Sequence, residues 1–86
     1  RYTANHIFSY IELDEKHAII EVAVPEDWQG RSIGELDIRR RYGVNILGAK
    51  RNGKTDVNIS PETVLDGSLT LLVLGENQKL KKHFHL

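Results

Sequence analysis

Alternating apolar and polar positions predict two strands at the start of the chain. Residues 5–13 alternate with apolar groups on both faces of the expected strand, and residues 14–16 form a polar turn. Residues 17–25 alternate again, are rich in β-branched side chains and end at Pro25, so they predict a second strand. In the first strand one set of positions is Ile7, Ser9, Ile11 and Leu13, and the other is Phe8 and Tyr10; in the second, Ile20, Val22 and Val24 alternate with Ile19, Glu21 and Ala23.

The next segment predicts a helix over residues 32–42. Ser32 with Glu35 three positions later is the pattern of a capping box, which satisfies two free backbone amides at a helix start. Gly43 is a suitable residue for the left-handed end of the helix.

This predicted helix has apolar residues on two sides. At about 100° per residue, Ile33, Leu36 and Arg40 lie on one side, whereas Ile38 and Tyr42 lie nearly opposite. One apolar side is expected to face the core. The other side needs a partner, a ligand or an earlier end of the helix.

A second pair of strands follows the helix. Residues 44–50 and residues 55–59 predict strands joined by Asn52-Gly53, the strongest short hairpin signal. In the returning strand Val57 and Ile59 are expected to face inward.

The last third of the chain predicts two turns, a strand and a helix. Residues 60–63 resemble a capped turn with Pro61 at its first position, and Asp66-Gly67 predicts another turn. Residues 68–74 are nearly all apolar and predict a central strand covered on both faces. Residues 76–84 predict a polar helix with Leu80 and Phe84 four apart.

The order of elements is ββαβββα and the fold class is α+β. We expect a small mixed, largely antiparallel sheet with helices packed on it. At 86 residues the chain forms one domain, residues 1–86, which buries only a modest fraction of its surface. Added burial in a dimer would stabilise it.

Composition excludes several classes of protein. There is no cysteine, so neither a disulfide framework nor a thiolate zinc site can form. Twelve basic and 12 acidic side chains give zero net charge, which argues against binding to a nucleic-acid polymer. The apolar run at residues 71–74 is too short to span a bilayer. The chain begins with Arg1 and contains no methionine, so we expect a piece excised from a longer, cytoplasmic protein.

Catalytic and metal-binding chemistry have little support. No nucleophile motif or glycine-rich phosphate loop is present, so we expect no enzyme. His83 and His85 lie two apart near the end of the chain, with His6 and His17 elsewhere, and no carboxylate or cysteine completes a ligand set. Solvated terminal histidines are the simpler interpretation, and we expect no metal.

Three successive arginines carry the strongest candidate chemistry. On a helix, residues 39–41 fan out over about 200°, so they cannot serve one site. Arg39 points to neither apolar side and is free to bind an anion such as phosphate. The alternative, which the residues alone favour, is a solvated helix end whose positive charges complement the helix dipole.

Surplus apolar side chains indicate an interface. Some of these side chains must belong to the core, but one sheet with two short helices cannot cover apolar groups on every face. The residues in question are Ile33, Ile38, Ile46 and Pro61. A twofold dimer is the commonest arrangement that covers such a surface.

The order of these motifs resembles the C-terminal regulatory domain of RCK (regulator of potassium conductance) proteins. The matching stretches are Ala18 to Pro25, Trp28 to Leu36 with the pattern G-x-S-I-x-E-L from Gly30, and Arg41 to Leu47 with the pattern Y-G-V-x-I from Tyr42. The hairpin, the proline turn, Asp66-Gly67 and the last apolar strand follow in the family's order. The resemblance covers residues 17–75 and is closest to the Ktr branch, the cytosolic gating subunits of bacterial potassium uptake systems.

The resemblance implies a function and a site. Members carry an N-terminal nucleotide-binding lobe, pair their C-terminal lobes as dimers, and form octameric rings on the cytoplasmic face of a membrane transport subunit. In the Ktr branch this lobe binds cyclic di-AMP at the twofold interface and so controls potassium uptake. Carried over by position, Ile33, Ile38 and Pro61 would contact adenine, Arg39 would bind a phosphate, and Asn45 and the backbone near Ile46 would hydrogen-bond the ligand.

Two alternatives remain open. The domain could be a ligand-free dimerisation and assembly module of an RCK ring, or a metal-binding enzyme fragment with a site around His83 and His85. Other RCK domains bind calcium or sodium, but the densest acids here, Glu12, Asp14 and Glu15, are better explained by a solvated turn.

Overall fold

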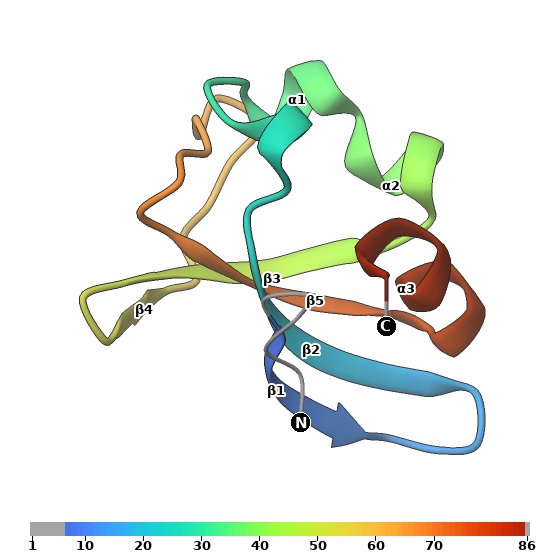
Figure 1. Cartoon of the computed structure of the whole chain (residues 1–86). Coiled ribbons are helices and arrows are strands. Elements are labelled where there is room, and N and C mark those ends of the chain that lie inside the picture. The colour runs from blue at the N-terminus through green and yellow to red at the C-terminus, as the bar shows by residue number, and fades with distance from the viewer. Residues whose placement is uncertain (1–6, 86) are drawn as a thin grey trace.

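Five strands form one antiparallel sheet in the computed structural model, which describes residues 7–85. The strands are β1 (Ile7–Glu12), β2 (His17–Ala23), β3 (Asn45–Arg51), β4 (Lys54–Asp56) and β5 (Thr70–Glu76). Their order across the sheet is β1-β2-β5-β3-β4, and all four neighbouring pairs are antiparallel (Figure 1). The predicted α+β class is confirmed. The first two residues of the strand predicted at 5–13, including His6, lie outside the described residues.

Short helices cover one face of the sheet. They are α1 (Ile33–Leu36), α2 (Ile38–Tyr42) and α3 (Asn77–Phe84), with a single 3₁₀ turn, η2 (Glu26–Trp28), after β2. In Figure 1, α1 and α2 lie above the sheet, and α3 lies beside α2. With eight residues, α3 is the longest described helix, and within residues 7–85 no helix can cross a bilayer.

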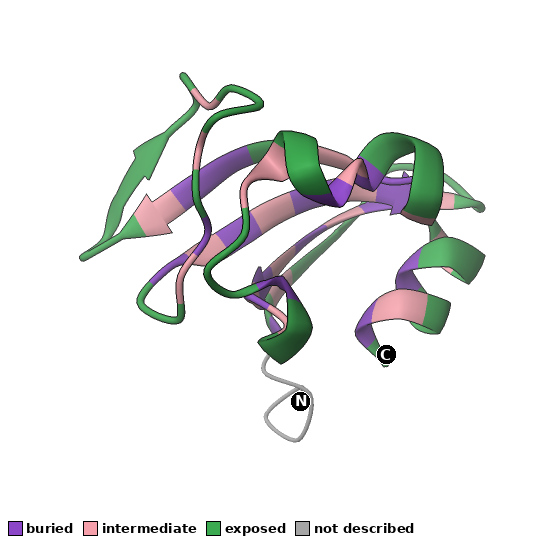
Figure 2. Ribbon diagram, turned by 90° about the horizontal axis from the view of Figure 1, so that it is seen from above, coloured by how far each residue is buried: buried purple, intermediate pink, exposed green. Residues whose placement is uncertain are grey.

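A single core lies between these helices and the sheet. Along β2 and β5 every second residue is buried, which gives the purple bands of Figure 2. From β2 and β5 the core takes Ala18, Ile20, Val22, Leu71 and Val73, and from the helices Trp28, Leu36, Ile38, Leu80 and Phe84. The predicted pairing of Leu80 and Phe84 on one helix face is confirmed.

The opposite face of the sheet carries apolar side chains that no described helix covers. Leu72, Leu74 and Ile19 are half-buried there, and Ile11 is 54% exposed. The strand predicted at 68–74 is central, as expected, but it is covered on one face only. It begins at Thr70 because the Asp66 carboxylate accepts the Ser68 backbone N–H at 2.8 Å and holds that residue in a turn.

A β-bulge in β1 changes which side chains face the core. Ile7 pairs with Val22 and is buried, but the register shifts before Ser9, which pairs with Glu21. The expectation that Ile7 and Ile11 share a face is therefore wrong. A bulge inserts one residue and reverses the alternation that follows it.

The helix predicted over residues 32–42 is broken at Asp37. The capping box is confirmed, since Ser32 Oγ accepts the Glu35 N–H at 3.0 Å and the Glu35 carboxylate accepts the Ser32 N–H at 3.4 Å. Gly43 ends the second piece in the left-handed conformation, as expected. Asp37, however, is itself left-handed (φ 51°, ψ 51°) and separates α1 from α2.

The predicted Asn-Gly hairpin is confirmed, but its returning strand is short. Asn52 and Gly53 both have positive φ, as a type I′ turn requires. β4 ends at Asp56, whose carboxylate accepts the Asn58 N–H at 2.9 Å in a local turn. Val57 consequently points to solvent, 66% exposed, so its predicted inward position is wrong, whereas Ile59 packs against the core.

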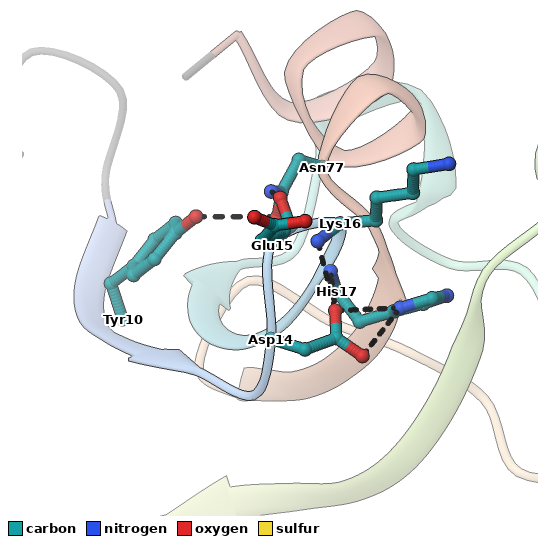
Figure 3. A network of polar contacts seen from close by, with 6 residues as sticks. All are labelled: Tyr10, Asp14, Glu15, Lys16, His17 and Asn77. Carbon is teal, nitrogen blue, oxygen red and sulfur yellow. Dashed lines mark hydrogen bonds and ion pairs between the residues drawn. The ribbon is translucent and has the colours of Figure 1, made fainter.

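A polar network fastens the β1–β2 turn to α3 (Figure 3). The Asn77 backbone N–H and side-chain amide donate to the carbonyls of Lys16 and Glu15, at 2.7 and 3.1 Å. Within the turn, the Asp14 carboxylate accepts the Lys16 and His17 backbone N–H groups and contacts the His17 imidazole at 2.9 Å. These bonds, the one from Lys16 foremost, lower the pKa of Asp14.

Candidate functional site

A groove of about 370 Å³ runs between α1, α2, the start of β3 and the segment before the proline turn. All six residues that the sequence singled out as ligand-binding lie along it. The lining residues are Ile33, Gly34, Asp37, Ile38, Arg39, Val44, Asn45, Ile46, Ile59, Ser60 and Pro61. The groove thus brings together positions up to 28 residues apart in the sequence, from Ile33 to Pro61.

Its walls are apolar. Ile33 is half-buried on the first turn of α1 and Pro61 is exposed on the opposite wall. Ile38 is only 3% exposed, so it belongs to the core as well as to the groove. The expectation that Ile38 and Leu36 lie on nearly opposite sides of one helix is wrong, because the helix is interrupted at Asp37 and both residues reach the core.

Backbone hydrogen bonds hold the two walls together. The Ile33 N–H donates to the Thr63 carbonyl at 2.9 Å, and the Gly34 N–H donates to the Pro61 carbonyl at 2.8 Å. A Cβ atom at Gly34 would lie 3.0 Å from Pro61, so a larger residue there requires Pro61 to move by a few tenths of an ångström. The sequence interpretation missed Gly34; a glycine in the first turn of a helix was the available signal.

The three arginines of α2 have different surroundings. The Arg40 Nε donates to the Asp37 carboxylate. The Arg41 guanidinium lies 5.5 Å from the centre of the Tyr42 ring. Arg39 is exposed on the groove and, within residues 7–85, forms neither an ion pair nor a ring contact. Its charge is therefore available to an anion in the groove.

The start of β3 supplies polar groups to the floor of the groove. Asn45 pairs with Leu74 and Ile46 with Val73, so the register of the sheet fixes both residues. Asn45 and Ile46 are half-buried and border the groove. Apolar walls, one uncompensated guanidinium and an amide suit a ligand that has a flat apolar part and an anionic part. The sequence interpretation did not include Asp37, Val44, Ile59 and Ser60 in this lining.

A larger hollow of about 860 Å³ lies between the end of β2, η2 and the end of α3. Its aromatic floor comes from Trp28, whose ring centre is 5.1 Å from that of Tyr42 and 5.6 Å from that of Phe84. None of the six predicted ligand residues lines it. The smaller groove is the candidate site because the Arg39 guanidinium and the Asn45 amide border it beside apolar walls.

The histidines near the end of the chain do not gather with other ligands. The His83 ring packs edge-on against Tyr42 at 4.9 Å, and burial, with Lys82 and Lys79 nearby, lowers its pKa. Within residues 7–85 no group of three or more histidines, aspartates or glutamates could hold a metal ion. His17 lies in the turn with Asp14, and His6 lies outside the described part of the chain.

Comparison with known proteins identifies a family and several relatives. A family model described as the TrkA-C domain matches residues 18–85. The Ktr system potassium uptake protein C of Bacillus subtilis is 32% identical over 72 residues, which cover 84% of this chain and 33% of that protein. The potassium uptake protein A of the same system and organism is 26% identical over 77 residues, which cover 90% of this chain and 35% of that protein. The chain spans about a third of the length of these curated relatives.

A solved structure shares the fold. It is the RCK C domain of the potassium transport protein KtrA in complex with cyclic diadenosine monophosphate (cyclic di-AMP). The two are 32% identical with a TM-score of 0.73, and the match covers 80% of this chain and 81% of that one.

Proposed function

Because the chain belongs to the TrkA-C domain family, we propose that it is the regulatory lobe of a potassium transport protein and that it binds cyclic di-AMP. The TrkA-C domain is a regulatory domain of a non-enzymatic family, in agreement with the expectation of no enzyme. The observation that carries the ligand is the groove itself, where six positions chosen from the sequence meet around one uncompensated arginine. The KtrA domain with cyclic di-AMP supports this choice of ligand.

Each group of the groove has a role in this proposal. Ile33, Ile38 and Pro61 form the walls against which adenine packs. The Arg39 guanidinium pairs with a phosphate, for which its planar donors are well suited. Asn45 and the backbone at Ile46 hydrogen-bond the polar edges of the ligand.

The groove holds half of the ligand, and a second copy of the chain completes the site. Cyclic di-AMP has two identical halves, so a twofold dimer presents each half with the same residues. The charges of the two phosphates then meet two copies of Arg39, one from each chain.

In the full protein the pair of lobes would act on transport by shifting a conformational equilibrium. Cyclic di-AMP can do so only if it binds one arrangement of the lobes more tightly than the other. We place the domain in the cytoplasm, as part of an octameric ring on a membrane potassium transport subunit. We propose that the full protein also carries an N-terminal nucleotide-binding lobe, since this chain spans only about a third of the relatives' length.

Calorimetric titration of the domain with cyclic di-AMP tests the proposal. We expect saturation at one ligand for two chains and a rise in melting temperature with ligand concentration. Cyclic di-GMP, ATP and calcium serve as controls in the same melting experiment and should have little effect. Absence of binding would refute the proposal that cyclic di-AMP is the ligand of this domain.

The uncovered face of the sheet favours a second candidate function, a ligand-free assembly module. Ile11, Ile19, Leu72 and Leu74 leave apolar surface there that another subunit would bury. This candidate predicts a dimer without ligand that Ile11→Asp dissociates, and a melting temperature that no nucleotide raises. Ile38→Asp would not separate the two candidates, because Ile38 is buried within the single chain.

A further inference from the structure

The groove depends on a backbone conformation that side chains rarely allow. Asp37 is left-handed, one of three non-glycine residues with positive φ among those described. Its N–H donates to the carbonyls of Ile33 and Gly34, both at 3.1 Å, and its carbonyl accepts the Arg41 N–H at 2.9 Å. Aspartate tolerates this conformation better than most residues, but still at a cost. Such strain at the edge of a groove points to a role there.

The break at Asp37 decides where the two following residues point. In a continuous helix Leu36 and Ile38 would lie about 200° apart. Here both are buried in the same core, 1% and 3% exposed. Arg39, the next residue, consequently lies on the groove instead of continuing the earlier helix face.

Asp37 also brings a negative charge to the groove. Its carboxylate belongs to a residue of the lining, as does the guanidinium of Arg39. Left alone, this carboxylate would repel a bound phosphate. Arg40 pairs with it from outside the lining, so the charge of Arg39 remains uncompensated in the groove.

We infer that Asp37 and Arg40 are positioning residues of the site, with two separable effects. The left-handed backbone of Asp37 places Ile38 and Arg39, and the Arg40 guanidinium neutralises the Asp37 carboxylate. Arg40 thus favours an anionic ligand without touching it. The second effect rests on the proposed function, because it needs an anion in the groove.

The charge effect is tested by a double-mutant cycle on cyclic di-AMP affinity at low salt. We expect Arg40→Ala to weaken binding by about twofold to fivefold, the worth of an exposed charge pair. Asp37→Asn keeps a residue that tolerates the left-handed conformation and removes the charge. In that background Arg40→Ala should change the affinity little, whereas a purely structural role of Arg40 predicts the same loss in both backgrounds.

Arg41→Ala is the matched control on the same helix. Equal losses in the two backgrounds, or no loss from Arg40→Ala, would overturn the charge effect.

The backbone effect is tested by melting the ligand-free domain. Asp37→Gly should melt at or above the natural chain, because glycine adopts positive φ freely, and Asp37→Ala should melt below it. Asn52→Ala is the control: it also strains a left-handed position, but in the hairpin, and should leave cyclic di-AMP affinity unchanged. A crystal structure of Asp37→Ala that keeps Ile38 buried in an unbroken helix would overturn the backbone effect. Absence of cyclic di-AMP binding to the natural chain would refute the proposed function and the charge effect with it. The melting temperatures and the crystal structure of Asp37→Ala need no ligand and decide the backbone effect.

Discussion

Gly34 and Pro61 lie in direct backbone contact across the candidate groove, with the Gly34 N–H 2.8 Å from the Pro61 carbonyl oxygen. A Cβ atom at position 34 would lie 3.0 Å from both the Cβ and the carbonyl oxygen of Pro61. The contact fixes the distance between the wall formed by α1 and the wall formed by the proline turn. The width of the groove therefore depends on the absence of a side chain at one position.

Gly34→Ala is expected to destabilise the domain and to widen the groove. The added methyl group would push Pro61 back by a few tenths of an ångström. Both residues are exposed, so we expect the low end of the usual cost of overpacking, about 1 kcal/mol. Chemical unfolding measures this loss, and calorimetry should show weaker cyclic di-AMP binding. Gly67→Ala is the control, because a side chain there meets the flexible end of Gln29. Similar losses from both variants would mean that the contact with Pro61 has no special weight.

Local signals in the sequence predicted much of the fold. The capping box at Ser32, the Asn52-Gly53 turn and the alternation along β2 each involve residues close in the chain, and the structure contains all three. The apolar residues on two sides of the predicted helix allowed an earlier helix end, but they did not locate the break at Asp37. It results from the demand that Leu36 and Ile38 both reach a core built by distant strands, which local pattern does not contain.

The candidate site was predicted for a different reason. Its six residues came from a resemblance in motif order, and the fold brings them to one groove. The pattern could not predict Ile59 as a lining residue, because its place follows from how the segment after β4 folds back onto α1. The β-bulge in β1 could not be predicted either, because no residue type in this segment marks the position of the extra residue.

Arg39→Ala is expected to weaken cyclic di-AMP binding by about 2–3 kcal/mol, the worth of a charge-assisted hydrogen bond. Arg39 has no ion-pair partner within residues 7–85, so its loss leaves no new unpaired charge in the domain. Calorimetry measures the change. Arg41→Ala removes the same charge two residues away, where the guanidinium lies against Tyr42, and should change binding far less. Tight binding by Arg39→Ala would refute the assigned role.

Ile38→Ala is expected to lower the free energy of unfolding of the ligand-free chain by about 2–5 kcal/mol, since it leaves a cavity in the core. Ile38 is 3% exposed within a single chain. Urea unfolding at low protein concentration measures the loss without a contribution from dimers. Val64→Ala, at a position 55% exposed, should change stability by less than about 0.5 kcal/mol. If the two variants were equally stable, Ile38 would be an interface residue and not a core residue.

Low pH should lower the stability of the domain because it protonates Asp66. The Ser68 hydroxyl, foremost, and the Arg51 guanidinium lower the pKa of Asp66 to about 2. A carboxyl group with a pKa lowered by folding stabilises the native state above its unfolded pKa of about 3.9, and this contribution is lost as the pH falls toward the folded value. We therefore expect the free energy of unfolding of the natural chain to fall between about pH 4 and about pH 2. In Asp66→Asn it should fall less steeply, because this variant has already lost the charge. Urea unfolding at several pH values measures both slopes.

Asp27→Asn is the matched control, because Asp27 forms no ion pair or side-chain hydrogen bond within residues 7–85. The stability of this variant should fall with pH as steeply as that of the natural chain. Equal slopes for the natural chain and Asp66→Asn would mean that the contacts of Asp66 with Ser68 and Arg51 do not persist in solution.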